Sequence, residues 1–331
     1  MGKSIYFLGF LLILLGVITA LENWTNKLSH TNESDNTIEI SHIPVTKDTD
    51  ASGYVTVTNI PIGDTGVYYW DSPMGPLGPS SFRVLADKND PENHTFWIDD
   101  RYGRRFVHFN SDDTLLQTVM VPEEIVDISD FIVKDGIFTV LDRAGYSPIL
   151  HTISSQGALL QHAVLPADPS ITGLRETKDG FLIEHEEGSW LSDVHIEMDN
   201  TATLTNHVSY MQLENNSNGF TITNGVNSAT QEIPNFLGAH IIDSPVDDII
   251  PIVVSEDTPK TSEVFDVKQS LWLLSKDLQL LVNIRLPFEK QHVYIEDPVV
   301  LASDGKVFGL ITFSDHISVI KFITPFNYVE R

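Results

Sequence analysis

Residues 128–166, ISDFIVKDGIFTVLDRAGYSPILHTISSQGALLQHAVLP, contain four short apolar runs separated by turn-forming residues. The first two runs meet at Asp135-Gly136, a pair that favours a type I′ turn because both central residues of that turn need a positive φ. The stretch therefore predicts a unit of four short antiparallel strands: ISDFIVK, GIFTVLD, PILHTIS and ALLQHAVLP.

The same unit recurs along the chain. Its first turn is repeated at Asp179-Gly180, Asn218-Gly219 and Asp304-Gly305, and the glycines from Gly136 onward are 44, 39 and 86 residues apart. These spacings predict further turns near residues 93 and 262. Four strands per roughly 40–45 residues are typical of one β-propeller blade. The last strand of the unit is repeated in LLQTVMVP (115–122), LLQHAVLP (159–166) and LLVNIRLP (280–287).

The two ends of the repeat region complement each other. The run YVTVTNIP (54–61) resembles the outer strand of a unit but precedes the first full unit. The last unit contains DPVVLAS, GKVFGLIT and ISVIKF and lacks an outer strand. We therefore predict an all-β, six-bladed β-propeller over 54–325, closed by strand 54–61, which leaves no long edge bare. A β-sandwich would explain the strands but neither the repeat nor the missing strand.

An apolar segment precedes the propeller. Lys3 is followed by a 17-residue apolar run, Ile5–Leu21. It is longer than the core of an ordinary signal peptide and near the lower limit for a transmembrane helix. Both a cleaved signal peptide and a retained signal anchor over 1–21 stay open, and in either case an N-terminal hydrophobic helix is expected. Residues 22–53 are rich in Asn, Thr, Ser and Asp and predict a flexible polar linker, or stalk. The propeller is thus expected outside the cytoplasm, membrane-anchored or secreted, with membrane contact through the N-terminal segment only.

Charge and cysteine content exclude several classes of function. The formal net charge is −26, with 46 acidic residues against 20 Lys and Arg. A nucleic-acid binder needs a basic surface to neutralise phosphates, so no nucleic-acid partner is expected. The chain has no cysteine, which excludes disulfides, thiolate nucleophiles and cysteine-ligated metal centres.

FWIDDRYGRRFVHFNSDDTLLQ (96–117) is similar to the NHL-repeat pattern, in which an Asp ends the second strand and an Arg opens the third. Asp99 or Asp100, Arg105 and Phe109 match those positions. The next unit matches at Asp142 and Gly157 but has no Arg, and the resemblance is strongest over 78–166. It implies a propeller fold. Because that superfamily includes binding modules, sugar lactonases and lyases, the resemblance transfers no activity.

The loops that follow the second strand of each blade or link one blade to the next meet at the mouth of the central channel, and ligand-binding residues are expected in these loops. A competing interpretation, which we favour, is that an Asp at a strand end accepts backbone hydrogen bonds and shapes the turn. An aromatic surface on which sugars stack could be formed by Trp70, Trp97, Trp190, Trp272 and the many Phe, but most of these are more simply explained as blade-packing residues, since blade faces need large side chains. The candidates are Asp99, Asp100, Arg101, Asp142, Arg143, His185, Glu186, Asp247, Asp248 and Asp315.

Metal sites have weak support in the sequence. Asp48, Asp50 and Ser52 resemble the start of a calcium loop, but its twelfth position is Asn59 and a simple turn is favoured. His185-Glu186 would begin an H-E-x-x-H zinc motif, but Ser189 stands where the second His is needed. No cofactor is expected, with calcium as the alternative.

Two functions remain. The favoured one is a binding or scaffold module for a protein or a polar small-molecule ligand, without catalysis. The alternative is a metal-dependent lactonase, hydrolase or lyase with its site at the central channel, where a cation polarises a carbonyl or activates water. Whether the protein is an enzyme stays open.

Overall fold

The computed structural model describes residues 37–39 and 53–324, with short gaps at 73–74, 87–89, 91–92, 178–179, 187, 207–210, 226, 243–248, 261–263, 288–290, 294 and 296–297. The predicted N-terminal helix, most of the polar linker and the calcium-loop candidates Asp48, Asp50 and Ser52 lie outside the described residues. No helix within these ranges is long and apolar enough to cross a membrane.

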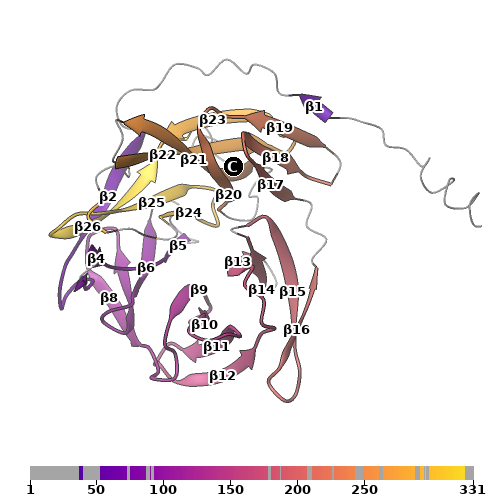
Figure 1. The fold of residues 1–331 in the computed structure, drawn as a ribbon. Helices are drawn as coiled ribbons and strands as arrows, with labels where there is room; N and C mark the ends of the chain where they lie inside the picture. Colours follow the sequence, from indigo (N-terminus) through magenta and orange to yellow (C-terminus); the bar gives the residue numbers. More distant parts are fainter. Residues whose placement is uncertain are drawn as a thin grey trace, which may run out of the picture. The chain divides into compact units, whose positions relative to one another are not determined.

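The chain folds as a six-bladed β-propeller (Figure 1), as predicted. Blades 1, 2, 3 and 5 each consist of four antiparallel strands that are consecutive in the sequence. Blades 4 and 6 each have three consecutive strands and a fourth strand, β1 or β2, from the N-terminal part of the chain. The short hairpin β3 (Trp70–Ser72) and β4 (Gly75–Leu77) precedes blade 1. The strands of blades 1 to 3 are β5 (Phe82–Ala86), β6 (His94–Asp100), β7 (Arg105–Asn110) and β8 (Leu115–Met120); β9 (Ile128–Lys134), β10 (Ile137–Asp142), β11 (Ile149–Ser154) and β12 (Leu159–Val164); β13 (Ile171–Thr177), β14 (Gly180–His185), β15 (Trp190–Ile196) and β16 (Ala202–Asn206). Those of blades 4 to 6 are β17 (Gln212–Asn216), β18 (Gly219–Thr223) and β19 (Ser228–Glu232), with β1 (Thr37–Glu39) beside β19; β20 (Phe236–Ile241), β21 (Ile249–Lys260), β22 (Val264–Ser275) and β23 (Leu280–Arg285); β24 (Val299–Leu301), β25 (Val307–Thr312) and β26 (His316–Phe322), with β2 (Tyr54–Pro61).

The first strand of each blade lies nearest the centre of the ring. Contacts join β9 to β13, β5 to β9, β24 to β5 and β17 to β20, all of them first strands of their blades. The outer strands, such as β8, β12 and β16, lie at the rim in Figure 1. Side chains on the first strands therefore approach the central channel.

Strand β2 completes the last blade. It pairs antiparallel with β26 from Tyr54↔Phe322 to Pro61↔His316, and the side chain of Ile60 is fully buried beneath it. The ring thus closes between strands far apart in the sequence, by the pairing that the missing strand of the last unit indicated.

The first hairpin of each blade uses glycine in more than one way. In blade 2 the central residues are Asp135 and Gly136, with φ of 51° and 75°, as a type I′ turn requires. In blade 4 the prediction was displaced by one residue, because Asn216 pairs with Gly219 and the turn is Ser217-Asn218. A Cβ on Gly219 would lie 1.9 Å from the Gln231 carbonyl oxygen, so glycine is needed there for close strand approach.

Blade 5 departs further from the predicted pattern. The turn expected near residue 262 exists, but it joins β21 to β22 and so belongs to the second hairpin of the blade. The first hairpin loop lies between Ile241 and Ile249. The prediction was wrong on this point because β21 and β22 are each 12 residues long, about twice the length of β20 and β23. The pairing of β20 with β21 ends at Phe236 and Glu256. The hairpin of β21 and β22 continues beyond that point, to the pairing of Lys260 with Val264.

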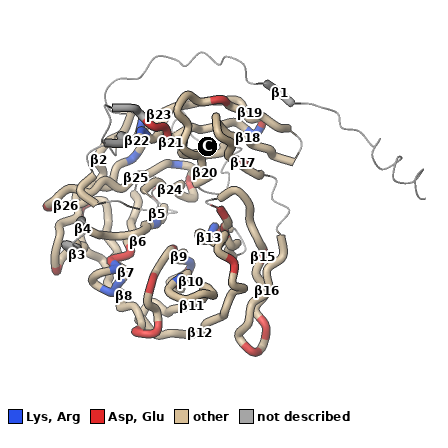
Figure 2. The backbone as a smooth tube through the Cα atoms, viewed as in Figure 1, with Lys and Arg blue, Asp and Glu red and all other residues tan. Residues whose placement is uncertain are grey.

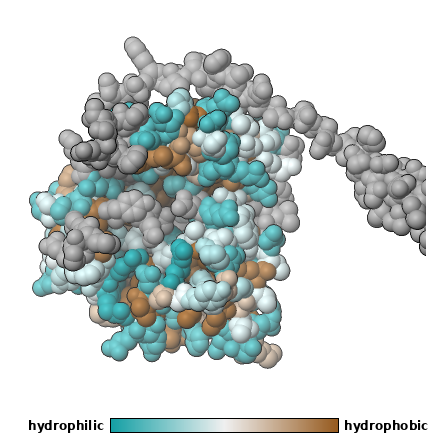
Figure 3. All heavy atoms as spheres, in the orientation of Figure 1, coloured by the Kyte–Doolittle hydropathy of each residue, from teal (hydrophilic) through white to brown (hydrophobic). Residues whose placement is uncertain are grey.

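Buried apolar side chains fill the spaces between neighbouring blades, which we call seams. Phe82 and Phe308 are fully buried in the cluster between blades 1 and 6, and Phe106 and Phe131 in that between blades 1 and 2. Similar clusters join blades 2 and 3, 4 and 5, and 5 and 6. On the molecular surface, apolar side chains are scattered among polar ones on the face shown in Figure 3.

Candidate functional site

The seam between blades 3 and 4 differs from the other five. No cluster of buried apolar residues joins these two blades among the residues that the structure describes. The cause is the alternation of side chains along blade 4. Leu213, Phe220 and Ile222 face blade 5, whereas the intervening positions, which face blade 3, are polar. On that polar face Thr221 Oγ1 lies 3.0 Å from Thr230 Oγ1.

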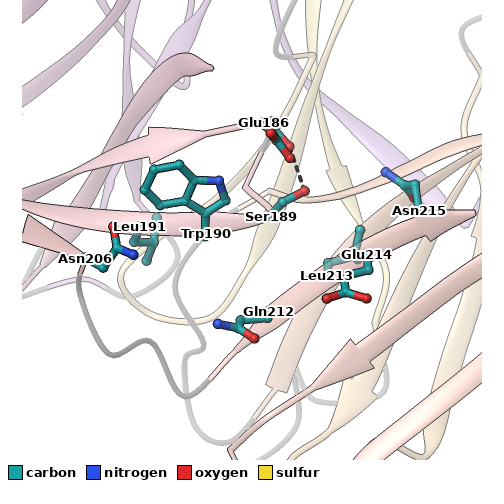
Figure 4. Close-up of a pocket in the computed structure, with 9 residues that line it drawn as sticks. All are labelled: Glu186, Ser189, Trp190, Leu191, Asn206, Gln212, Leu213, Glu214 and Asn215. Carbon is teal, nitrogen blue, oxygen red and sulfur yellow. Dashed lines mark hydrogen bonds between the residues drawn. The ribbon is translucent and has the colours of Figure 1, made fainter. Parts of the chain in front are cut away.

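A cavity of about 650 Å³ opens at this seam (Figure 4), and we call it the seam cleft. Trp190 and Leu191 belong to β15, and Gln212 and Glu214 to β17, so the two blades supply opposite walls. The cleft is lined by Glu186, Ser189, Trp190, Leu191, Asn206, Gln212, Leu213, Glu214 and Asn215.

One end of the cleft is the turn between β14 and β15. Glu186 has a φ of 49° and Gly188 a φ of 89°. A Cβ on Gly188 would lie 2.5 Å from the Ile241 carbonyl oxygen and 2.8 Å from an Arg175 guanidinium nitrogen, so only glycine fits there. Ser189 Oγ donates to the Glu186 carbonyl oxygen at 2.8 Å, and the Ser189 carbonyl accepts from Leu213 N at 3.3 Å. The turn is thereby held against both blade 5 and blade 4.

The Trp190 indole is supported from one side by His185. The two rings are stacked, with centroids 3.5 Å apart and an interplanar angle of 9°. His185 is fully buried, and its Nδ1 lies 2.9 Å from Ser170 Oγ. Because Ser170 Oγ donates its proton to Asp168 at 2.7 Å, His185 Nδ1 must be the donor to Ser170. Burial lowers the pKa of His185 and outweighs the opposing effect of the Asp168 carboxylate. A neutral His185 thus fixes the plane of the indole.

Asn215 ties the far wall of the cleft to blade 5. Its Nδ2 donates to the Ala239 carbonyl oxygen at 2.9 Å, and its Oδ1 accepts from Ala239 N at 3.0 Å. The side-chain amide thus pairs with a strand backbone as another strand would. This holds β17 in position although blade 4 contributes few apolar contacts to blade 3.

The channel-mouth candidates on blade 1 fall into two groups. Asp99 is fully buried, accepts from Ser80 Oγ at 2.6 Å, and has a pKa raised to about 7 by burial. Arg101 Nε lies 3.9 Å from Asp99 Oδ2, and Arg101 also donates to the Ile128 carbonyl oxygen. Asp100, on the other face of β6, accepts from Tyr68 N at 2.9 Å and Gly103 N at 3.2 Å. The structure therefore brings Asp99 and Arg101 together and gives Asp100 a role in shaping the turn.

Asp142 also shapes a turn. It accepts from Val126 N, Asp127 N and Ala144 N at 2.8, 3.1 and 2.9 Å. Burial raises the pKa of Asp142, but His151 and these backbone donors outweigh it and hold the pKa at about 2.

Of the remaining candidates, Arg143 follows β10 in blade 2 and Asp315 lies between β25 and β26 in blade 6, so these two lie in separate blades. Arg143 N donates to the Asp127 carbonyl oxygen at 3.0 Å. The exposed Asp315 carboxylate accepts from His316 Nδ1, with 2.8 Å between Nδ1 and Oδ1. Asp247 and Asp248 lie outside the described residues. His185 and Glu186 come together at the seam cleft, where His185 acts through Trp190.

Sequence reasoning missed a largely buried charged network on the first strands of blades 1 to 3 and on β14. Arg83 pairs with Asp130, and Arg175 pairs with Glu184. Asp130 also accepts from Leu174 N at 2.8 Å, which joins blades 2 and 3. Burial raises the pKa of both Asp130 and Glu184 against the effect of the arginines. The available signal was a charged residue in the middle of an otherwise apolar run, as in FRVLA, ISDFIVK and ITGLRET.

The polar lining of the cleft was also missed, apart from Glu186. Asn206, Gln212 and Glu214 carry no motif, and only the pairing of two particular strand faces brings them to one cavity. Within the described ranges, no group of three or more His, Asp or Glu side chains is placed to hold a metal ion.

No family model and no curated protein matches the chain. A structure of a member of the DUF4221 family from Bacteroides vulgatus is similar, with 8% identity, 81% of this chain and 97% of that chain covered, and a TM-score of 0.48. A streptogramin B lyase structure has 12% identity, coverage of 76% and 96%, and a TM-score of 0.40. A glucose dehydrogenase has 10% identity, coverage of 81% and 98%, and a TM-score of 0.41. At these identities and scores the likenesses carry no argument about function.

Proposed function

We propose that the chain is an extracytoplasmic recognition propeller that binds a polar ligand, either free or part of a protein, in the seam cleft. The observation that supports this most directly is the contrast between seams. Five are filled with apolar side chains, and at the sixth the two blades present polar side chains to a cavity of about 650 Å³. Small-molecule sites in proteins commonly measure about 300–1,000 Å³.

The walls of the cleft suit recognition. Filling a seam with apolar side chains stabilises a fold by about 25 cal/mol per Å² of apolar surface buried. A seam lined with polar side chains therefore stabilises the fold less than an apolar seam of the same area. Trp190 offers an aromatic surface whose plane is fixed by His185, and Asn206 and Gln212 offer amide donors and acceptors. A ring whose plane is already fixed loses little conformational entropy when a ligand binds against it.

The position outside the cytoplasm belongs to the same proposal and is supported by the apolar run Ile5–Leu21. Protease protection on intact cells tests it. Digestion of the propeller by added protease, or its release into the medium, is expected, and a pool protected until the cells are lysed would contradict it.

Kinship with NHL-repeat propellers is also proposed. Asp100 ends β6 and Arg105 opens β7, and Arg105 Nε lies 2.7 Å from Asp100 Oδ2. Two positions that carry the resemblance therefore form one ion pair. This pair supports a structural likeness and leaves activity open.

Ligand-induced thermal stabilisation tests recognition in the cleft. The full chain would be screened against neutral sugars, amino acids, polyamines and dicarboxylates, because a ligand that binds only the folded state raises the melting temperature. Stabilisation by at least one class is expected for the wild type, with loss in Trp190→Ala and in Gln212→Ala. Trp70→Ala is the matched control, because Trp70 is 51% exposed and its ring packs at a tilt against that of Tyr102, which does not line the cleft.

Two outcomes would contradict the proposal. Stabilisation that survives both cleft variants would place the ligand elsewhere. A shift produced by calcium and lost in Asp142→Ala would instead favour the metal-dependent lactonase, hydrolase or lyase at the central channel.

A further inference from the structure

We propose that the seam cleft selects an organic cation, that is, a ligand presenting a protonated amine. This inference rests on the proposed function and specifies the chemical class of its ligand.

The charge of the surrounding chain is the first support. The 81 residues between Lys178 and Lys260 contain fourteen acidic residues and no lysine or arginine. They supply every residue that lines the cleft. In Figure 2 the backbone along β15 and β16 is tan or red. The field in this part of the ring therefore attracts cations and repels anions.

The lining of the cleft is the second support. It contains two carboxylates, those of Glu186 and Glu214, and neither Lys nor Arg. Both glutamates are exposed. The nearest arginine in the turn region, Arg175, is already paired with Glu184 and donates to the Ile241 carbonyl oxygen at 2.8 Å. The positive charge that would balance the cleft carboxylates is thus left to a ligand.

Desolvation distinguishes a cationic ligand from a neutral one. A neutral sugar that covers Glu186 and Glu214 would remove water from two carboxylates without supplying a counter-charge, which is unfavourable. A protonated amine supplies that charge and donates hydrogen bonds to carboxylate, amide and hydroxyl oxygens. The Trp190 face adds cation–π attraction, which is strongest for indole among the aromatic side chains.

The shape of the cleft distinguishes an organic cation from a metal ion. A metal ion needs several oxygen ligands within roughly 2.0–2.6 Å of one point, whereas this cavity measures about 650 Å³ and includes Trp190 and Leu191 in its walls. Apolar walls beside carboxylates fit the methylene groups and the ammonium of an alkylamine. A small polyamine and a lysine side chain of a peptide share this chemistry.

Titration calorimetry on the full chain tests the inference with defined probes. The probes are spermidine, a lysine-containing tetrapeptide, the same peptide with acetylated lysine, maltotriose and citrate. Binding of spermidine or the lysine peptide is expected, and no binding of the other three. Tight binding of spermidine indicates a free polyamine, whereas preference for the peptide indicates a lysine on a protein.

Charge-neutral variants localise the effect. Glu186→Gln and Glu214→Gln are each expected to weaken amine binding about tenfold or more, because each removes a charge-assisted contact. Glu124→Gln, at an exposed position in the loop between blades 1 and 2, removes the same charge elsewhere and is expected to change affinity less than about twofold through the screened field.

Each contrary result has a separate meaning. If maltotriose binds and Trp190→Ala abolishes that binding while amines do not bind, the cation inference fails and the proposed recognition function stands. Equal losses of amine affinity in Glu124→Gln and in the cleft variants would show that the overall negative charge of the protein, and not the cleft, attracts the amine. That result would overturn the inference. If no probe of any charge binds, both the inference and the proposed function fail.

Discussion

The guanidinium of Arg175, on the first strand of blade 3, donates to the carbonyl oxygen of Ile241, on the first strand of blade 5, at 2.8 Å. The contact joins blades 3 and 5, which are separated along the chain by blade 4. Arg175 is 4% exposed and is also paired with Glu184. One buried arginine thus connects blades 3 and 5 where the seam between blades 3 and 4 lacks an apolar cluster among the described residues.

Replacing Arg175 is expected to destabilise the whole ring. Arg175→Met leaves the Glu184 carboxylate, which is 17% exposed, without its partner. Breaking a fully buried pair costs about 3–5 kcal/mol, and this value is the upper limit here because Glu184 retains some contact with water. The double variant Arg175→Met/Glu184→Leu removes both charges and should recover a large part of that loss. The free energy of unfolding in urea measures both variants. A double variant as unstable as Arg175→Met would show that the unpaired charge is not the cause.

Gly188 is expected to be irreplaceable in the cleft turn. An alanine there would take a strained φ near 89° and would place its Cβ 2.5 Å from the Ile241 carbonyl oxygen. A residue held in such a region costs about 1–3 kcal/mol. Gly188→Ala should therefore lower the melting temperature and weaken ligand binding, because Glu186 and Ser189 move with the turn. Gly238→Ala is the control, since its Cβ would meet no atom within 4 Å. Equal effects of the two variants would contradict this account.

The fold could be predicted from the sequence where its determinants are local. The alternation of apolar residues and the Asp135-Gly136 turn depend on neighbours along the chain, and the structure confirms the strands of blade 2. The one-residue displacement in blade 4 has a different origin. Gly219 is needed because the Gln231 backbone approaches it from the next strand, and no local pattern carries that information.

The candidate site could be predicted only in part. Glu186 was identified from its position after a second strand, and it does line the seam cleft. Glu214 and Gln212 were missed because they look like ordinary outward-facing strand residues. Their role depends on which blade lies opposite, and that is a property of the assembled ring. Asp99 was identified, but its burial and its raised pKa could be recognised only from the packing around it.

Closure of the ring by β2 is expected to depend on Ile60. This side chain is fully buried between blades 1 and 6, whereas Val55, on the same strand, is 44% exposed. Ile60→Ala should cost about 2–5 kcal/mol, the usual range for removing a buried aliphatic side chain. Val55→Ala should cost about 1 kcal/mol or less, since surface substitutions have small effects. Urea unfolding compares the two, and similar losses would mean that β2 contributes little to closure.

Asp99 is expected to make stability depend on pH in the direction opposite to Asp142. Burial raises the pKa of Asp99 from 3.8 to about 7, so between these values the folded state holds a proton that the unfolded state has lost. The contribution of Asp99 to the free energy of unfolding is therefore fully present below pH 3.8 and is lost as the pH rises through 7. For a fully buried group the loss is on the order of a few kcal/mol. Asp142, with its pKa lowered to about 2, contributes stability that is present above pH 3.8 and lost as the pH falls toward 2.

Asp99→Asn separates the two effects, because the amide keeps the shape and the hydrogen bond to Ser80 without titrating. Urea unfolding of the wild type and of Asp99→Asn would be compared from pH 4 to pH 8. The difference in free energy of unfolding should grow in favour of the variant as the pH rises and level off above about pH 7. Asp315→Asn is the control, because the exposed Asp315 pairs with His316 and its pKa is lowered by that contact. A difference for Asp99→Asn that stays constant over this range would show that Asp99 is already ionised at pH 4 and that Arg101 neutralises it.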